Sequence, residues 1–140
     1  MDRILDQGRI GPLHLRRTDI AQLLIDSICF RQEQLRQLQL HSFVIMANHV
    51  HALITPHVEI SKLMHSLKRY TSRKANQILV LTGQPFWQEE SYDHLVRDES
   101  EFRRIVAYIE LNPVKAGLVT TPEAFPWSSA SKPELIQRVE

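Results

Sequence analysis

Cysteine is almost absent from this chain of 140 residues, which contains Cys29 alone. A single thiol excludes a disulfide within the chain and leaves no second thiol to share a metal ion. This usage is typical of a protein in the reducing cytoplasm. No apolar run approaches the roughly 18–20 residues of a membrane-spanning helix, and the opening MDRILDQGRI lacks the apolar centre of a secretory leader. We therefore expect a cytoplasmic protein that does not enter a membrane.

Repeats, low-complexity tracts and linker-like stretches are also missing, so nothing in the sequence divides it into two domains. Hydrophobic residues make up 43% of the chain and charged residues 24%. That balance is typical of one globular domain rather than of a disordered chain. We expect a single domain over residues 1–140, in which residues 128–140 form a tail of loop, short helix or disorder.

Acidic residues are missing between Glu59 and Glu89, although the net charge of the chain is only +1. Five basic residues lie in that interval, and four of them fall within seven residues: Lys68, Arg69, Arg73 and Lys74. A local basic patch can hold an anionic polymer such as nucleic acid even when the whole protein is almost neutral. The alternative is a solvated helix face that happens to be basic.

Apolar spacing predicts two helices in the first 80 residues, at 18–37 and 59–80. Thr18 or Asp19 is the expected N-cap of the first helix, and Ser61 that of the second. Between the two helices, 38–46 and 48–56 are rich in strand formers, and the hinge Ala47-Asn48 predicts an antiparallel hairpin.

A third helix is expected to begin after Asp98, with Glu101 placed to complete a capping box. We expect it to end near Pro113, because the residue before a proline is pushed out of the helical region. The segment 86–96 is predicted to be extended and at a sheet edge. The resulting order of elements predicts an α+β fold with helices packed on an antiparallel sheet.

A histidine pair stands out in the second predicted strand, within NHVHALI. Because residues two apart in a strand point the same way, His49 and His51 should project from one face. Two neighbouring imidazoles can bind a divalent cation. The alternative is one histidine in the core and one on the surface.

A tyrosine and an asparagine lie four residues apart in the third predicted helix, in AYIELNPVKAG. At about 100° per residue, this spacing places Tyr108 and Asn112 on one side of the helix. From there they are able to reach the histidine face of the sheet. The alternative is a tyrosine at the edge of the core and an asparagine that ends the helix.

Two further side chains are candidates for contact with a nucleic acid. Trp87 can stack on a splayed base, although its apolar neighbours favour a packing role. Lys115 follows the tyrosine–asparagine pair and is able to contact a phosphate; a solvated lysine is the alternative.

Together, these residues resemble a known family. The segments VIMANHVHALI, SLKRYTSRKANQ, FWQEESYDHLVRDESEFRRIVAYIELNPVKAGLV and PWSSA occur in the order and spacing of REP-associated tyrosine transposases. Those proteins are HUH single-strand DNA endonucleases with one catalytic tyrosine. The similarity covers roughly residues 40–130 of this chain.

The resemblance implies a ferredoxin-like, palm-like fold and a set of functional residues. It implies His49 and His51 as metal ligands, Asn112 as a third ligand, and Tyr108 as the nucleophile. The metal would be Mn²⁺ or Mg²⁺, and the partner single-stranded or hairpin DNA beside the basic helix. The implied activity is DNA cleavage and strand transfer through a covalent phosphotyrosine, and related transposases form dimers.

Two departures from the family pattern are expected to matter. Relatives carry a central first strand ahead of LDQGRIGPLHL, and here Met1 falls where that strand should already have ended. We therefore expect the strand to be missing through a shortened start, or to be supplied by another segment or another chain, with weakened stability, strand exchange in a dimer, or a shifted sheet. Ala47 replaces a proline common before NHVH. The missing strand keeps two alternatives open, a non-catalytic DNA-binding module and an inactive remnant.

Overall fold

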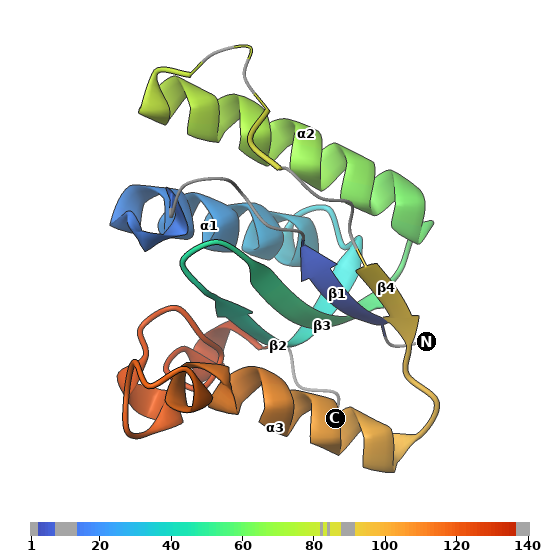
Figure 1. The fold of residues 1–140 in the computed structure, drawn as a ribbon. Coiled ribbons are helices and arrows are strands. Elements are labelled where there is room, and N and C mark those ends of the chain that lie inside the picture. The colour runs from blue at the N-terminus through green and yellow to red at the C-terminus, as the bar shows by residue number, and fades with distance from the viewer. Residues whose placement is uncertain (1–2, 8–13, 82, 84, 88–91, 137–140) are drawn as a thin grey trace.

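The computed structural model describes residues 3–7, 14–81, 83, 85–87 and 92–136, which form one sheet covered by helices on both faces (Figure 1). The strands are β1 (Arg3–Gln7), β2 (Leu38–Ile45), β3 (Val50–Pro56) and β4 (Tyr92–Leu95). The sheet order is β2-β3-β1-β4, and every neighbouring pair is antiparallel.

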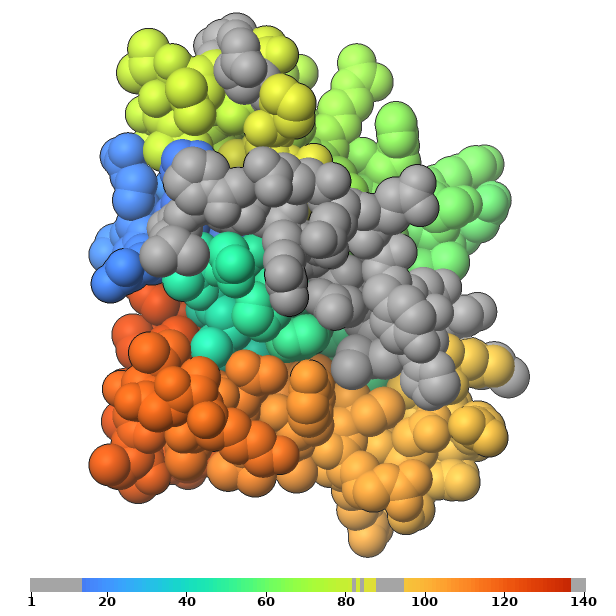
Figure 2. Space-filling view, in the orientation of Figure 1, coloured from blue at the N-terminus to red at the C-terminus, as the bar shows by residue number. Residues whose placement is uncertain are grey.

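Three helices complete the layers: α1 (Thr18–Glu33), α2 (Ile60–Leu79) and α3 (Glu99–Lys115). The helices α1 and α2 cover one face of the sheet, and α3 covers the other (Figure 1). In the space-filling view, α2 (yellow-green) and α3 (orange) lie at opposite ends of the molecule (Figure 2). The order β1-α1-β2-β3-α2-β4 is that of the ferredoxin-like fold, which confirms the predicted fold class.

The expectation of a missing first strand is wrong. β1 is present and central, paired with β3 on one side and β4 on the other. Its sequence, RILDQ, is a poor strand by local preference. Pairing on both sides supplies partners for its backbone groups, and such tertiary context overrides weak strand propensity. The instability, strand exchange and shifted sheet expected from its absence therefore lose their basis.

The predicted helix boundaries are confirmed in part. The N-cap of α1 is Arg17 and makes no side-chain capping bond, so Thr18 and Asp19 lie inside the first turn. Similarly, α2 is preceded by Glu59, and Ser61 lies inside the helix with its hydroxyl donating to that carboxylate. In both cases an ion pair or side-chain contact in the first turn replaces the predicted cap.

The cap of α3 is the one that the sequence predicted. The Asp98 carboxylate accepts from the Glu101 backbone N–H at 2.8 Å. The Glu101 carboxylate reaches back to the backbone N–H of Arg97 at 2.9 Å. This reciprocal pair fixes the start of α3 after the edge strand β4.

Two hydrophobic clusters hold the layers together, one on each face of the sheet. Strand β3 serves both: Val50, Ala52 and Ile54 belong to the cluster under α1 and α2, and Leu53 to the cluster under α3. This alternation fixes the register of β3, because a slip of one residue would exchange its two faces. Within the described residues, no helix is long and apolar enough to cross a membrane.

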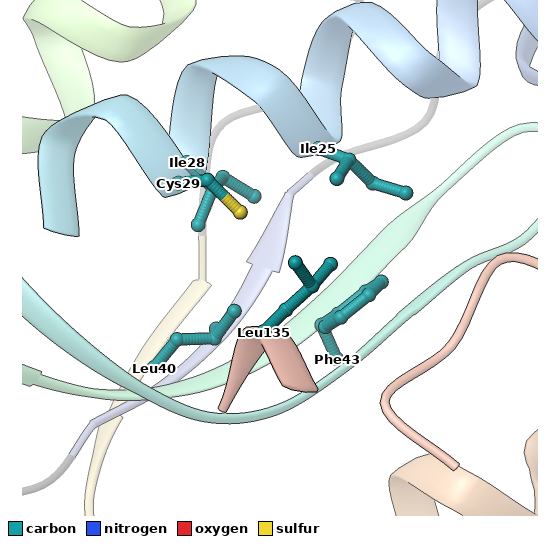
Figure 3. Close-up of a pocket in the computed structure, with 6 residues that line it drawn as sticks. All are labelled: Ile25, Ile28, Cys29, Leu40, Phe43 and Leu135. Atoms are coloured by element: carbon teal, nitrogen blue, oxygen red, sulfur yellow. The ribbon is translucent and has the colours of Figure 1, made fainter. Parts of the chain in front are cut away.

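The chain after α3 folds back onto the core. In Figure 3, Leu135 faces Phe43 and Leu40 of β2 and the side chains of α1. Cys29 lies in the same group, and burial raises the pKa of its thiol to about 11, as expected for an inert core cysteine. Residues 128–136 of the segment expected as a tail thus include the packed residues Leu135 and Ile136.

Ser42 is a weak point in the core. Its side chain is fully buried on β2, and within the described part of the chain its hydroxyl has no hydrogen-bond partner. We expect Ser42→Ala to raise the free energy of unfolding by about 1 kcal/mol, because it removes an unsatisfied buried polar group. Urea unfolding would measure this, with Ser66→Ala at an exposed position of α2 as a control. A loss of stability would show that the hydroxyl does have a partner.

Candidate active site

The β2–β3 hairpin carries the histidine pair. The Met46 backbone N–H donates to the His49 carbonyl at 2.8 Å, which confirms the two-residue hinge. His49 lies just before β3 and His51 within it. Their rings meet edge to face with centroids 4.8 Å apart, so both imidazoles lie together as the strand alternation predicted.

The two imidazoles differ in their surroundings. His51 is 7% exposed, whereas His49 is half-buried. The Nδ1 atom of His49 lies 2.9 Å from the side-chain oxygen of Asn48. Because an amide oxygen only accepts, this contact requires a proton on Nδ1. A hydrogen bond of this kind orients an imidazole as a metal ligand and sets its tautomer.

Tyr108 reaches this pair from α3, on the same face of the sheet. Its ring centroid lies 5.8 Å from that of His51, at an interplanar angle of 70°. The side chain is 46% exposed, so a large substrate is able to reach it. The amine of Lys115 lies 5.9 Å from the centre of the Tyr108 ring. The tertiary structure therefore gathers two histidines, a phenol and a cation.

Asn112 keeps its helical position: α3 ends two residues after Pro113, close to the predicted place, but the residue before the proline is not pushed out of the helix. The helix runs on to Lys115, and Pro113 is buried inside it. The Asn112 carbonyl accepts from the Ala116 N–H at 3.0 Å, and the Pro113 carbonyl accepts from the Leu118 N–H at 3.0 Å. Proline removes one donor, but packing and these bonds hold the last turn. Asn112 thus lies one turn beyond Tyr108, on the same side of α3.

The predicted basic patch does not lie beside Tyr108 and the histidine pair. Lys68, Arg69, Arg73 and Lys74 are all on α2, which covers the face of the sheet opposite α3 (Figure 1). Trp87 also lies with that layer. Its indole N–H donates to the buried Thr71 hydroxyl at 3.1 Å, and its ring packs against Phe86. This surrounding fits the packing alternative for Trp87.

A buried hydrogen-bond relay behind α3 was not found from the sequence. The Ser129 hydroxyl donates to the Glu110 carboxylate at 2.6 Å and accepts from the Phe43 backbone N–H at 3.1 Å. Trp127 and Ser129 also bond the backbone of β2. This relay holds α3 on the flank away from Tyr108. The only sequence signal was PWSSA, which does not by itself indicate a partner.

We expect Ser129→Ala to lower the free energy of unfolding by about 1–3 kcal/mol, because the change leaves a buried N–H and a carboxylate without their shared partner. Urea unfolding would measure this loss. Ser131→Ala, in the same segment but half-exposed, is the control and should cost less. Equal effects of the two changes would contradict a special role for the relay.

Comparison with known proteins assigns the chain to the transposases. Residues 16–112, more than half of the chain, match the family described as IS200-like transposase. The chain belongs to the IS200-like transposase family. No curated protein gives a significant match.

Two solved structures share the fold. One is a REP-associated tyrosine transposase bound to a REP hairpin, with a TM-score of 0.71 and 19% identity over 99% of this chain and 86% of that one. The other is a candidate transposase from Deinococcus radiodurans, with a TM-score of 0.54 and 22% identity over 79% of this chain and 88% of that one. At these identities the likeness concerns the fold, and it agrees with the predicted resemblance.

Proposed function

We propose that this protein is a metal-dependent DNA endonuclease and strand transferase in which Tyr108 is the nucleophile. The observation that supports this most directly is the 5.8 Å separation between the Tyr108 and His51 rings, because it places a phenol beside a pair of imidazoles. The family assignment adds DNA transposition as the setting.

The chemistry follows from the phenol. The Tyr108 oxygen attacks the phosphorus of a phosphodiester, a P–O bond to the tyrosine forms, and the P–O bond to one sugar oxygen breaks. The phenol loses its proton and the leaving hydroxyl gains one. Because the covalent phosphotyrosine keeps the energy of the broken ester, attack by another DNA hydroxyl can restore a phosphodiester. Strand transfer therefore needs no external energy source.

The donor set fits a divalent cation. His49 and His51 would hold it through ring nitrogens, and Asn112 would contribute an amide oxygen from the facing helix. Such mixed ligands suit Mn²⁺ well and Mg²⁺ less well. The bound ion would supply positive charge next to the reacting phosphate. Lys115, close to the phenol, would contact a phosphate.

DNA is the proposed partner, in single-stranded or hairpin form. The solved transposase with the same fold is bound to a REP hairpin. The basic residues of α2 and the Tyr108 site lie on opposite faces of the sheet. DNA that contacts both therefore passes around the edge of the sheet. A cytoplasmic location and a homodimer remain predictions from the sequence.

A covalent-adduct assay tests the proposal. Labelled hairpin oligonucleotides with single-stranded extensions would be incubated with the protein and Mn²⁺, then run on a denaturing gel. We expect a labelled protein band that EDTA abolishes. Tight DNA binding without an adduct would instead favour the non-catalytic module. If the protein neither binds the DNA nor forms the adduct, the inactive remnant is favoured.

A further inference from the structure

A groove between α1 and α2 lies on the face of the sheet opposite Tyr108. It has a volume of about 450 Å³ and is lined by Leu23, Asp26, Ser27, Phe30, Arg31 and Tyr70. Five of these residues come from α1 and one from α2. The groove is therefore built by the helix pair itself, apart from the candidate active site.

Arg31 is the first feature that indicates a ligand. The residue is only 8% exposed, yet its guanidinium donates to a neutral group, the Gln37 amide oxygen, at 3.0 Å. Among the described residues it forms no ion pair. Burial lowers the pKa of the guanidinium, and the neighbouring Tyr70 partly offsets this. Because arginine stays charged in proteins, a buried guanidinium without a carboxylate favours an anionic ligand.

Two exposed aromatic rings are the second feature. Phe30 is 53% exposed and Tyr70 is 38% exposed, although both line the groove. They come from different helices and so flank the same space. Exposed rings beside a cation are the platforms on which unpaired bases stack.

The charge around the groove indicates where a ligand's phosphate would lie. The Lys74 amine lies 6.0 Å from the centre of the Tyr70 ring, and Arg73 is exposed on the same helix. Asp26 is the acidic residue of the groove, and its carboxylate accepts from Gln22 at 2.8 Å. That carboxylate repels a phosphate, so the end of the groove near Arg31 is the favoured one.

We propose that the groove between α1 and α2 holds one unpaired nucleotide of the bound DNA, with its base against Phe30 and Tyr70 and its phosphate at Arg31. This inference rests on the proposed function only in taking DNA as the partner; it does not need cleavage. The exposed basic residues of α2 would then contact the phosphates of the neighbouring nucleotides. The groove would be a second contact point, away from the reacting phosphate.

The test is an equilibrium titration of the full chain with fluorescein-labelled dT12 in EDTA, where no metal-dependent cleavage takes place. We expect Phe30→Ala and Tyr70→Ala each to weaken binding about tenfold, because each removes a ring on which the base stacks. Arg31→Lys should also weaken it, because a compact ammonium replaces a planar fork that grips a phosphate. Leu35→Ala, at another exposed apolar residue after α1, should leave the affinity unchanged.

An abasic version of the same 12-mer separates base contact from backbone contact. Wild type should lose affinity for the abasic strand, whereas the double variant Phe30→Ala/Tyr70→Ala should bind both strands almost alike. If dT12 binds through Arg69 and Arg73 and its affinity is unchanged in Phe30→Ala and Tyr70→Ala, the inference is overturned while the proposed function stands. If poly-glutamate displaces dT12 and binds with the same affinity as dT12, the groove binds an acidic protein and the inference is overturned. If neither dT12 nor hairpin DNA binds, DNA as partner fails in both proposals.

Discussion

Tyr108→Phe should abolish the covalent protein–DNA adduct and lower the cleavage rate by at least about 10³-fold, because it removes the one oxygen that forms the new bond to phosphorus. The ring and its contacts with His51 and the Lys115 amine remain possible in the variant. DNA affinity and thermal stability should therefore change little. The measurement is the single-turnover rate of cleavage of a hairpin oligonucleotide, with the adduct followed on a denaturing gel.

The matched control is Tyr92→Phe, which makes the same chemical change on β4. It should form the adduct at close to the wild-type rate. If Tyr108→Phe still cleaves while adduct formation is lost, water rather than the phenol can act as nucleophile, and strand transfer through this residue is excluded. If both variants behave like wild type, Tyr108 is a residue at the edge of the core, as its alternative interpretation held.

His51→Ala should abolish Mn²⁺ binding and cleavage together. Loss of a ligand should cost more than the 10–100-fold in affinity that is typical for loss of a supporting residue. Asn48→Ala, which removes the hydrogen-bond partner of the His49 Nδ1 atom, should fall in that smaller, roughly 10–100-fold range. Binding of Mn²⁺ can be followed by its electron paramagnetic resonance signal, independently of activity.

The graded series makes this prediction specific. His57→Ala, at an exposed histidine away from the pair, is the control and should bind Mn²⁺ like wild type. His49→Ala and Asn112→Ala should both weaken binding, since each would remove one proposed ligand. Equal affinity of the Asn112 variant and wild type would remove that residue from the metal site while leaving the histidine pair in place. If His51→Ala binds Mn²⁺ with the affinity of wild type, the metal site is excluded altogether.

The opposite placement of the two predicted regions limits how DNA can lie on this protein. The Tyr108 site lies on the face of the sheet that α3 covers, whereas the basic residues and the Arg31 groove belong to the α1–α2 layer (Figure 1). One continuous DNA that contacted both regions would therefore have to leave one face of the sheet before it reached the other. A hairpin with a single-stranded extension suits that path, because its unpaired part is flexible enough to turn around an edge.

Local patterns in the sequence were sufficient for much of the site. Two histidines separated by one residue share a face in a strand, and the structure has their rings 4.8 Å apart. The spacing of four between Tyr108 and Asn112 predicts one side of a helix, and α3 includes both. Asp98 and Glu101 predicted the start of that helix. Each of these features depends on strand or helix periodicity, which acts over a few residues.

Other features depend on partners far along the chain, and the sequence did not indicate them. RILDQ becomes the central strand because β3 and β4 bond it on both sides. The Ser129 hydroxyl gains its role only where β2 and α3 meet it. The sequence by itself therefore determined which groups share a face of one element. The tertiary structure alone decided which faces meet, because pairing and packing between distant segments outweigh weak local preference.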